Sequence, residues 1–443
     1  MILHDPSLQR LFGVLDCLVD EQVGVIRHLT ELEREPGAPD FFHFFAKTCD
    51  TRAFNRQQNY GNAGGASRER ALAMAKAVGE AVERYCSAFY EREELTFTSF
   101  AETSLPCTDP SRFSLYLHTQ YRQPNFPYVP FERTTPVNWT PACDAVTGDK
   151  EYVPAAMVFM PYYFDKERGE QPITQRISTG LACHCSWPEA AVSAICEVIE
   201  RDAFTITWQS MIGPPHILKE TLSDENLDLL KRIEHTGAHV NLLNITLEHG
   251  VPTVLAVAQQ QRPSAPALIF AASANLDPEM AVRKSIEELA HTWRLAHQLK
   301  TRLPPLVPGL SFENVKSQDD HVHLYCNHAN TSLAEFLFSS SRQINFQEMV
   351  KISTGEPRQD LENLVDRIFL TGHKVLLADL TTPDIRDLDL WVVRAILPGF
   401  HPLFIGHHLR AQGGSRLWEV PRRLGYRGIS RETGDNPAPH PYP

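Results

Sequence analysis

Two short segments of this chain share a pattern that strongly constrains its fold, because each places paired carboxylates on an otherwise apolar helix. Residues 73–84 read AMAKAVGEAVER, and residues 190–201 read AAVSAICEVIER. In each segment the two glutamates are three positions apart, so they share one face of an α-helix, and an arginine follows directly. Most other positions are Ala, Val, Ile, Met or Gly, which makes each helix apolar around most of its circumference. The sequence therefore predicts two related helices that are largely buried.

The charges on these helices need partners. A buried carboxylate is costly unless it meets a cation or binds a metal ion, and one arginine for each pair of glutamates leaves net negative charge. Mg²⁺ would balance that charge, since it prefers oxygen ligands from a few carboxylates, phosphates and water. The arginines could then bind phosphate groups bidentately. We predict a nucleotide and Mg²⁺ site here, with salt bridges between the helices as the alternative. Its metal ligands would be Glu80, Glu83, Glu197 and Glu200, and its phosphate ligands Arg84 and Arg201.

The common nucleotide-binding motifs are absent from the sequence. Neither Gly-x-x-x-x-Gly-Lys-Ser/Thr nor Gly-x-Gly-x-x-Gly occurs, so a nucleotide would be bound by another architecture. Residues 64–67, Gly-Gly-Ala-Ser, stand at the predicted start of the first helix. Their backbone amides could bind an anion there, with Ser67 as the N-cap.

The remaining pattern predicts an α+β fold with mixed sheets. We expect the first helix to span residues 67–89 and the second to begin at Ser186, where Glu189 completes a capping box. A third helix should follow Asp277, which can cap it, and Pro278, which fits its first turn. Short apolar runs broken by Gly and Pro predict strands within 129–172, 251–257, 267–271, 374–379 and 390–397.

Composition excludes several classes of protein. The net charge is −12 and no basic run occurs, so the chain lacks the electrostatic footprint of a nucleic-acid-binding protein. No apolar segment reaches the roughly 20 residues of a membrane helix, and residues 1–20 do not read as a signal peptide. Nine cysteines, an odd number without framework spacing, indicate free thiols. We expect a cytoplasmic enzyme without disulfides.

The two helices and their surroundings resemble the YcaO family, and within it the ATP-dependent cyclodehydratases of thiazole/oxazole-modified microcin biosynthesis. The matching motifs span most of the chain. They are Tyr60–Tyr85, Ser178–His184, Glu197–Phe204, Ala274–Glu288, Asp379–Ile385 and Leu397–Leu403. On this resemblance, we expect an N-terminal segment at 1–45, an ATP-binding catalytic domain at 46–430 and a proline-rich tail at 431–443.

The resemblance also implies a set of site residues. The nucleotide and Mg²⁺ would lie among Glu189 and the two Glu-Glu-Arg groups already named. The family's third helix usually offers an arginine to the phosphates, and here Arg283 and Lys284 are both candidates. The family often has Gly-Lys-Gly in its first motif, whereas this chain reads Ala63-Gly64-Gly65, so no lysine stands at that position.

The tail reads Pro-Ala-Pro-His-Pro-Tyr-Pro from Pro437 to Pro443 and is similar to the Pro-x-Pro-x-Pro terminus of the azoline-forming subgroup. Proline favours the polyproline II conformation, a semi-rigid rod of about 3.1 Å per residue that can insert into a cleft. We expect Pro439, Pro441 and Pro443 to act in catalysis, ordering the active site through the terminal carboxylate without contacting the nucleotide. A disordered tail is the alternative.

By resemblance, the chain would use ATP and Mg²⁺ to convert Cys, Ser or Thr residues of a precursor peptide into thiazolines or oxazolines. Thioamide or macroamidine formation, and a non-catalytic scaffold role, are the alternatives. No fused leader-binding module is evident, so we expect a separate E1-like partner that recognises the leader peptide. A flavin-dependent azoline dehydrogenase and a homodimer within a larger complex are also expected.

Overall fold

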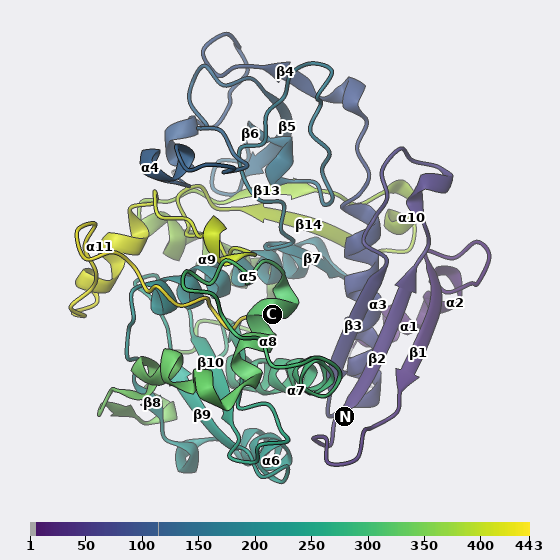
Figure 1. Cartoon of the computed structure of the whole chain (residues 1–443). Coiled ribbons are helices and arrows are strands. Elements are labelled where there is room, and N and C mark those ends of the chain that lie inside the picture. Colours follow the sequence, from purple (N-terminus) through teal and green to yellow (C-terminus); the bar gives the residue numbers. More distant parts are fainter. Residues whose placement is uncertain (1–5, 114) are drawn as a thin grey trace.

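The computed structural model describes residues 6–113 and 115–443 and is α+β, as predicted from the sequence. Three β-sheets surround a set of central helices (Figure 1). Residues 1–5 of the predicted N-terminal segment lie outside the described residues, and its boundary at residue 45 falls within strand β2, Phe42–Thr48.

The first sheet is antiparallel, with the order β1-β2-β3. The second has the order β11-β10-β9-β8-β12 and is mixed, because β8 and β12 run parallel. The third has the order β4-β5-β13-β14-β7, with β6 paired to β5. The strands are β1 Ile26–Leu32, β2 Phe42–Thr48, β3 Asn62–Ser67, β4 Thr96–Thr98, β5 Val137–Asp144, β6 Lys150–Pro154, β7 Leu181–His184, β8 His216–Ile217, β9 His239–Asn244, β10 Thr253–Gln259, β11 Leu268–Ala274, β12 Gln343–Ile344, β13 Leu376–Asp379 and β14 Trp391–Ile396.

The helices connect and cover these sheets. The α-helices are α1 Pro6–Gly13, α2 Leu15–Leu18, α3 Arg70–Cys86, α4 His118–Tyr121, α5 Trp187–Gln209, α6 Asp224–Glu234, α7 Pro278–Arg302, α8 Gln318–Cys326, α9 Pro357–Leu370, α10 Pro383–Arg386 and α11 Arg416–Arg423. The 3-10 helices are η2 Thr51–Ala53, η3 Arg92–Glu94, η4 Pro110–Arg112, η5 Ala155–Met157, η6 Lys219–Thr221, η7 His328–Phe338, η8 Phe346–Glu348 and η9 His407–Leu409.

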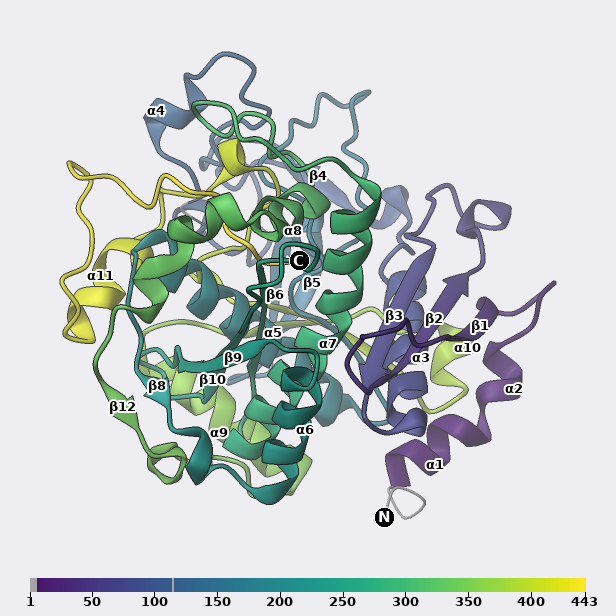
Figure 2. The same cartoon turned by 60° about the horizontal axis from the view of Figure 1, so that its bottom comes forward.

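Helices α3, α5 and α7 lie where the sheets meet. Helix α3 packs on β2 and β3 and also contacts β7, and both views show it beside β1, β2 and β3 at one side of the molecule (Figures 1 and 2). Helix α5 contacts β14 and β7 of the third sheet and β11 of the second. Helix α7 packs on β10 and β11 and reaches β3. Because α5 is covered by two sheets, nearly every side of it is apolar, as its sequence predicted.

The main secondary-structure predictions are confirmed, with two corrections. The two repeated segments form α3 and α5, and α7 begins after Asp277, whose side chain accepts a hydrogen bond from the Glu279 amide. The first helix begins later than predicted, however, because residues 62–67 form strand β3 and Ser67 is not its N-cap. Ser186 does precede α5, but its hydroxyl donates to the Glu189 carboxylate and caps no backbone amide.

Two predicted absences can be compared with the described residues. Within 6–113 and 115–443, no helix combines the length and apolarity needed to span a bilayer. All nine cysteines are free, which confirms the prediction that the chain has no disulfides.

Candidate active site

The Glu-Glu-Arg groups of α3 and α5 lie close enough for their charges to interact, and backbone amides in or beside β3 and β7 donate to their carboxylates. On α3, Glu80 accepts a hydrogen bond from the Gly64 amide at 2.8 Å and pairs with Arg84 at 2.9 Å. Glu83 accepts one from the Cys183 amide of β7 at 2.9 Å. The predicted anion-binding amide of Gly64 is therefore occupied by a glutamate of the protein. This corrects the prediction that residues 64–67 form a free anion cradle.

Helix α5 repeats the arrangement. Glu197 accepts a hydrogen bond from the Gly180 amide at 3.0 Å, and Arg201 lies 3.6 Å from both Glu197 and Glu200. Gly180 has φ +86°, and a Cβ there would lie 2.5 Å from the Ala395 carbonyl oxygen. Only glycine fits at position 180, because the backbone there has a positive φ and β14 leaves no room for a Cβ. This glycine in turn places its amide where it can donate to Glu197.

Burial and crowding raise the pKa values of Glu83, Glu197 and Glu200. Burial raises the pKa of Glu83 well above its usual range, and the neighbouring Glu80 and Glu197 raise it further. Burial raises the pKa of Glu200 to about 7, although Arg201 and the Tyr442 hydroxyl oppose the shift. The pKa of Glu197 is also raised by burial, against the opposing charge of Arg201. The protein's own cations therefore do not neutralise this cluster.

A second group of charges adjoins the first and was missed from the sequence. Ser67 donates to Glu287 of α7 at 2.7 Å, and Lys76 of α3 lies 2.9 Å from Glu287 and 3.4 Å from Glu288. Although burial opposes it, Lys76 and His291 lower the pKa of Glu288 to about 2. Spacing could have identified Lys76, because residues 76, 80 and 83 follow the i, i+4, i+7 repeat of one helix face.

Within the described residues, three predicted site residues form no ion pair with Glu80, Glu83, Glu197 or Glu200. Glu189 contacts Ser186 and His184 near the start of α5, two turns before Glu197. Arg283 pairs with Glu287 and Glu69, next to Ser67. Lys284 makes no ion pair with the described residues, and its charge lowers the pKa of the buried Cys196 thiol, which burial raises to about 12. The geometry thus favours neither Arg283 nor Lys284 as a phosphate ligand.

The proline-rich tail is ordered and buried. In Figure 1 the yellow C-terminal segment runs from α11 to the middle of the molecule and ends beside α8. Residues 438–442 are buried; side chains of the core bond to their backbone carbonyls, and the His440 side chain bonds to a carbonyl of the core. The hydrogen bonds run from Trp208 to Ala438 O, from Tyr325 to Pro439 O, from His321 Nδ1 to His440 O, and from His440 Nε2 to Phe404 O. The tail is therefore a component of the core, and the disordered alternative is wrong.

The end of the tail reaches the carboxylate cluster. The Tyr442 hydroxyl donates to Glu200 at 2.5 Å, and Arg201 lies over the Tyr442 ring and donates to the Pro443 carbonyl at 3.3 Å. Glu200 and Arg201 are two of the predicted ligands, so the tail contacts residues of the predicted nucleotide site. That the tail acts in catalysis without contacting the nucleotide itself stays a prediction. Tyr442 was not predicted as a site residue. Its polar tip beside Glu200 explains why the tail carries a tyrosine between two prolines.

The donor set fits Mg²⁺ and phosphate. Four crowded glutamates face two arginines, and within the described residues the buried Nε atoms of Arg84 and Arg201 have no hydrogen-bond partner. No three His, Cys, Asp or Glu side chains in that part of the chain are grouped so as to hold a metal ion by themselves. Mg²⁺ commonly takes only one or two protein carboxylates and completes its shell with phosphate and water. These guanidinium nitrogens, which form no hydrogen bond within the described residues, are suitable donors for those phosphates.

Comparison with known proteins agrees with this geometry. The family model described as YcaO cyclodehydratase, ATP- and Mg²⁺-binding, matches residues 64–401. A solved heterocyclase in complex with substrate and cofactor matches with a TM-score of 0.80 and 21% identity, over 98% of this chain and 57% of its own length. This chain thus spans little more than half of that heterocyclase.

Two further structures match over most of both chains. YcaO from Methanopyrus kandleri bound with AMPPCP and Mg²⁺ has a TM-score of 0.63 and 22% identity, over 88% of this chain and 90% of that one. The E. coli microcin synthetase McbBCD complex with pro-MccB17 bound has a TM-score of 0.55 and 16% identity, over 84% and 88%. At such identities these matches establish the shared fold alone.

Proposed function

This chain belongs to the YcaO family of ATP- and Mg²⁺-binding cyclodehydratases, and from that premise we propose that it forms azoline rings in a ribosomally made precursor peptide. The reaction closes the side chain of a Cys, Ser or Thr residue onto the preceding carbonyl carbon. A new S–C or O–C bond forms, the former amide oxygen leaves, and the peptide loses one water. When bound, MgATP supplies the phosphoryl group that makes this oxygen a leaving group.

One observation carries the proposal: four partly buried carboxylates outnumber the two arginines of their helices, and within the described residues the Nε atom of each arginine forms no hydrogen bond. Glu80, Glu83, Glu197 and Glu200 would hold Mg²⁺, and Arg84 and Arg201 would hold the phosphates. The backbone amides of Gly64, Gly180 and Cys183 fix three of these carboxylates before any ligand arrives. A site oriented in advance by the scaffold is what positioning catalysis requires.

The docked tail supports azoline formation over the thioamide and macroamidine alternatives, since a Pro-x-Pro-x-Pro end is a mark of the azoline-forming subgroup. Pro439, Pro441 and Pro443 restrict the backbone on either side of His440 and Tyr442. We assign them the role of presenting Tyr442 to Glu200 and Arg201, where the tail can order the site.

We further propose that the enzyme works in a complex, with an E1-like partner that binds the leader peptide and, in some pathways, a flavin-dependent dehydrogenase that oxidises the azolines. A homodimer within that complex and a cytoplasmic location complete the proposal. The McbBCD synthetase, solved with pro-MccB17 bound, supports this view because its matching chain acts within a multi-protein complex.

The decisive experiment combines the protein with ATP, Mg²⁺, a precursor peptide encoded beside its gene and the E1-like partner. Mass spectrometry should detect the loss of one water for each ring, and the loss should require ATP. A protein that hydrolyses ATP without dehydrating the peptide would favour the thioamide or macroamidine alternatives. A protein that neither binds nor hydrolyses ATP would favour the scaffold role.

A further inference from the structure

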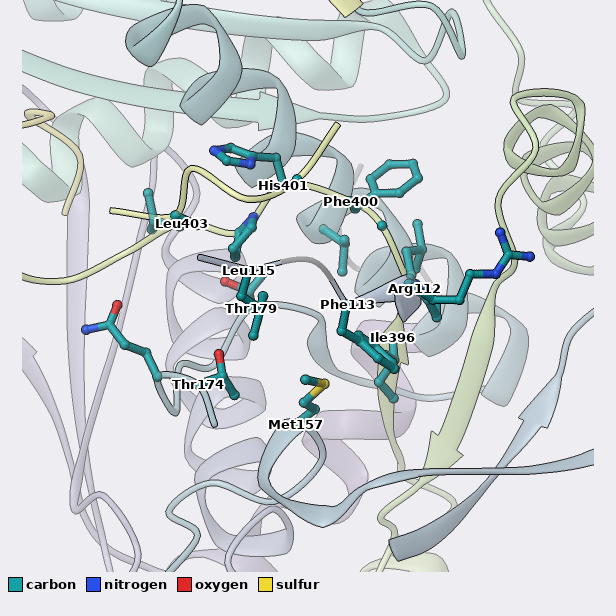
Figure 3. A pocket seen from close by; sticks show the side chains of 18 of the residues that line it. Arg112, Phe113, Leu115, Met157, Thr174, Thr179, Ile396, Phe400, His401 and Leu403 are labelled. Atoms are coloured by element: carbon teal, nitrogen blue, oxygen red, sulfur yellow. The ribbon is translucent and has the colours of Figure 1, made fainter. Parts of the chain in front are cut away.

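Ring closure needs a group that accepts the proton of the attacking thiol or hydroxyl, a task given to none of the metal and phosphate ligands above. Histidine is the side chain most often used for such a transfer, and the substrate must be able to reach its ring. His401 lines the cavity of about 340 Å³ shown in Figure 3, but it is only 2% exposed. Its Nδ1 atom, which forms no hydrogen bond within the described residues, is enclosed by protein. By contrast, the His291 side chain of α7 is 40% exposed and lies close enough to Glu80 for their charges to interact.

Strand β3 brings the His291 ring and a predicted Mg²⁺ ligand to a single residue, Gly64. The Gly64 amide donates to Glu80 at 2.8 Å. A Cβ on Gly64 would lie 2.9 Å from His291 Nε2 and 3.1 Å from its Cε1 atom, so the ring packs directly against this glycine. Because the same residue binds Glu80, the ring is held next to the predicted metal and phosphate site.

Glu288 determines which nitrogen of the His291 ring carries the proton. The two residues are three positions apart and share a face of α7. The Glu288 carboxylate lies 3.7 Å from His291 Nδ1 and 3.4 Å from Lys76 Nζ. A carboxylate beside Nδ1 favours the tautomer that is protonated there and leaves a lone pair on Nε2. Contacts of this kind are often long in enzymes without substrate and shorten in the reacting complex.

The Nε2 atom is available to a substrate. In the described part of the chain it forms no hydrogen bond, and the side chain that carries it is 40% exposed. The titratable groups that face the ring are Glu288 on α7, Glu80 and Lys76 on α3, and His43 on β2, whose ring centroid is 6.2 Å away. Burial lowers the pKa of His291, but Glu288 and Glu80 outweigh burial and raise that pKa above 6.5. The ring is therefore a stronger base than an isolated histidine.

The pair of Glu288 and His291 adjoins both Glu-Glu-Arg groups. The charge of His291 interacts with Glu80 of α3, and the charge of Glu288 interacts with Glu200 and Arg201 of α5. In the peptide, the attacking side chain belongs to the residue that follows the carbonyl. A carbonyl oxygen that is phosphorylated between these groups therefore brings the attacking side chain into the vicinity of His291.

We propose that His291 is the general base of ring closure and that Glu288 is its positioning residue. As the thiol or hydroxyl attacks the preceding carbonyl carbon, its proton moves to His291 Nε2, the S–C or O–C bond forms, and the π electrons of the carbonyl move to oxygen. That oxygen then takes the phosphoryl group of ATP and leaves, and the amide proton is lost to water as the C=N bond forms. The assignment rests on the proposed azoline-forming function, because it names the base of that reaction.

Ring formation by His291→Gln at two pH values tests the assignment. The substrate is the precursor peptide encoded beside the gene, altered to carry one cyclisable Cys, and it is supplied with the E1-like partner, ATP and Mg²⁺. A free thiol has a pKa of about 8.5, so about 3% of it is thiolate at pH 7 and about 75% at pH 9. A thiolate needs no base. His291→Gln should therefore lower the single-turnover rate about 100-fold at pH 7 and less than about tenfold at pH 9. Comparison with the wild type at each pH cancels the titration of groups that both proteins share, such as Glu200.

Two other variants complete the experiment. His235→Gln is the matched control and should keep the wild-type rate, because His235 is an exposed histidine at the end of α6. Gly64→Ala keeps the amide that donates to Glu80, whereas its methyl group displaces the His291 ring, so it should lower the rate at pH 7 at least tenfold. A wild-type rate in Gly64→Ala would contradict the placement of the ring.

The outcomes separate the base from the proposed function. An unchanged rate in His291→Gln, or a defect of equal size at both pH values, would overturn the general-base role. Mg²⁺ with AMPPCP should raise the melting temperature of His291→Gln as it does that of the wild type. Loss of that rise would assign His291 to nucleotide binding and also overturn the role. Wild-type protein that forms no ring at either pH would refute the proposed function itself.

Discussion

Replacing Glu200 with glutamine should stabilise the protein at alkaline pH and remove its nucleotide-dependent activity at the same time. In the folded chain the pKa of Glu200 is raised from 4.5 to about 7, mainly because the group is buried. Glutamine keeps the shape and can still accept the Tyr442 hydrogen bond, but it never ionises. The variant therefore loses a charge that we assign to Mg²⁺ and also loses the cost of burying that charge.

The size and sign of the effect follow from proton linkage. One pKa unit corresponds to about 1.4 kcal/mol, so the shift of Glu200 corresponds to about 3 kcal/mol. The folded state holds this proton more tightly than the unfolded state. Below pH 4.5, the pKa of Glu200 in the unfolded chain, burial of this group does not lower the free energy of unfolding of the wild type. As the pH rises from 4.5 to about 7 that free energy falls, and at pH 8 the whole decrease is present. Glu200→Gln lacks this loss.

Urea denaturation of both proteins at pH 5, 6, 7 and 8 measures the gap. The free energy of unfolding of Glu200→Gln should exceed that of the wild type by an amount that grows with pH to about 3 kcal/mol. Without peptide, Mg²⁺ with AMPPCP should raise the melting temperature of the wild type and not of the variant, and ring formation should fall by about 100-fold in the variant. A pH-independent gap would refute the electrostatic reasoning. Normal Mg²⁺-dependent binding by the variant would refute the metal-ligand role.

Three further predictions test other parts of the site. Deleting Pro439–Pro443 should abolish ring formation and also weaken AMPPCP binding, because the tail contacts two predicted nucleotide-site residues. Titration calorimetry measures the affinity for AMPPCP. A wild-type affinity in the truncated protein would support the purely catalytic role first expected of the tail. Gly180→Ala should destabilise the protein by about 1–3 kcal/mol and reduce ATP hydrolysis, because φ is +86° and the added Cβ meets the Ala395 carbonyl; an unchanged melting temperature would contradict this. Lowering the pH from 6.5 to about 4 should destabilise the packing of the tail. His321 and His440 are buried and neutral, and burial lowers their pKa values. Each ring accepts a hydrogen bond from a backbone N–H, and a protonated ring would repel that donor. Hydrogen exchange of residues 436–443, corrected for its intrinsic pH dependence, should accelerate across that window relative to β10.

The paired helices could be predicted because their signal is local. The spacing of Glu80 and Glu83 and of Glu197 and Glu200, within apolar surroundings, determines both the helix face and its burial. The α+β class followed from the same periodicity. Ser67 was wrongly predicted as an N-cap because the glycine-rich residues before it resemble a loop. In the structure these residues pair with β2 and form strand β3, which ends at Ser67. Local sequence does not encode that pairing.

The missed contacts depend on tertiary structure. Lys76 has a local signal, but its partners Glu287 and Glu288 lie on α7, more than 200 positions away. Tyr442 looked like a spacer between prolines, since nothing nearby in sequence indicates that Glu200 receives its hydroxyl. Arg394 reads as an interruption of an apolar strand, and only the folded structure shows the cavity beside it.

The contacts that assemble this site join very distant parts of the chain, which has a consequence for how the protein folds. Cys183 binds Glu83 across 100 positions, Ser67 binds Glu287 across 220, and Tyr442 binds Glu200 across 242. Contacts of such separation form slowly, because the intervening chain must first lose its conformational freedom. A partly folded intermediate would hold at most one of the two Glu-Glu-Arg groups in place and could not turn over ATP. In a refolding experiment, ATP turnover would therefore return only in the last kinetic phase, after the helical signal has recovered.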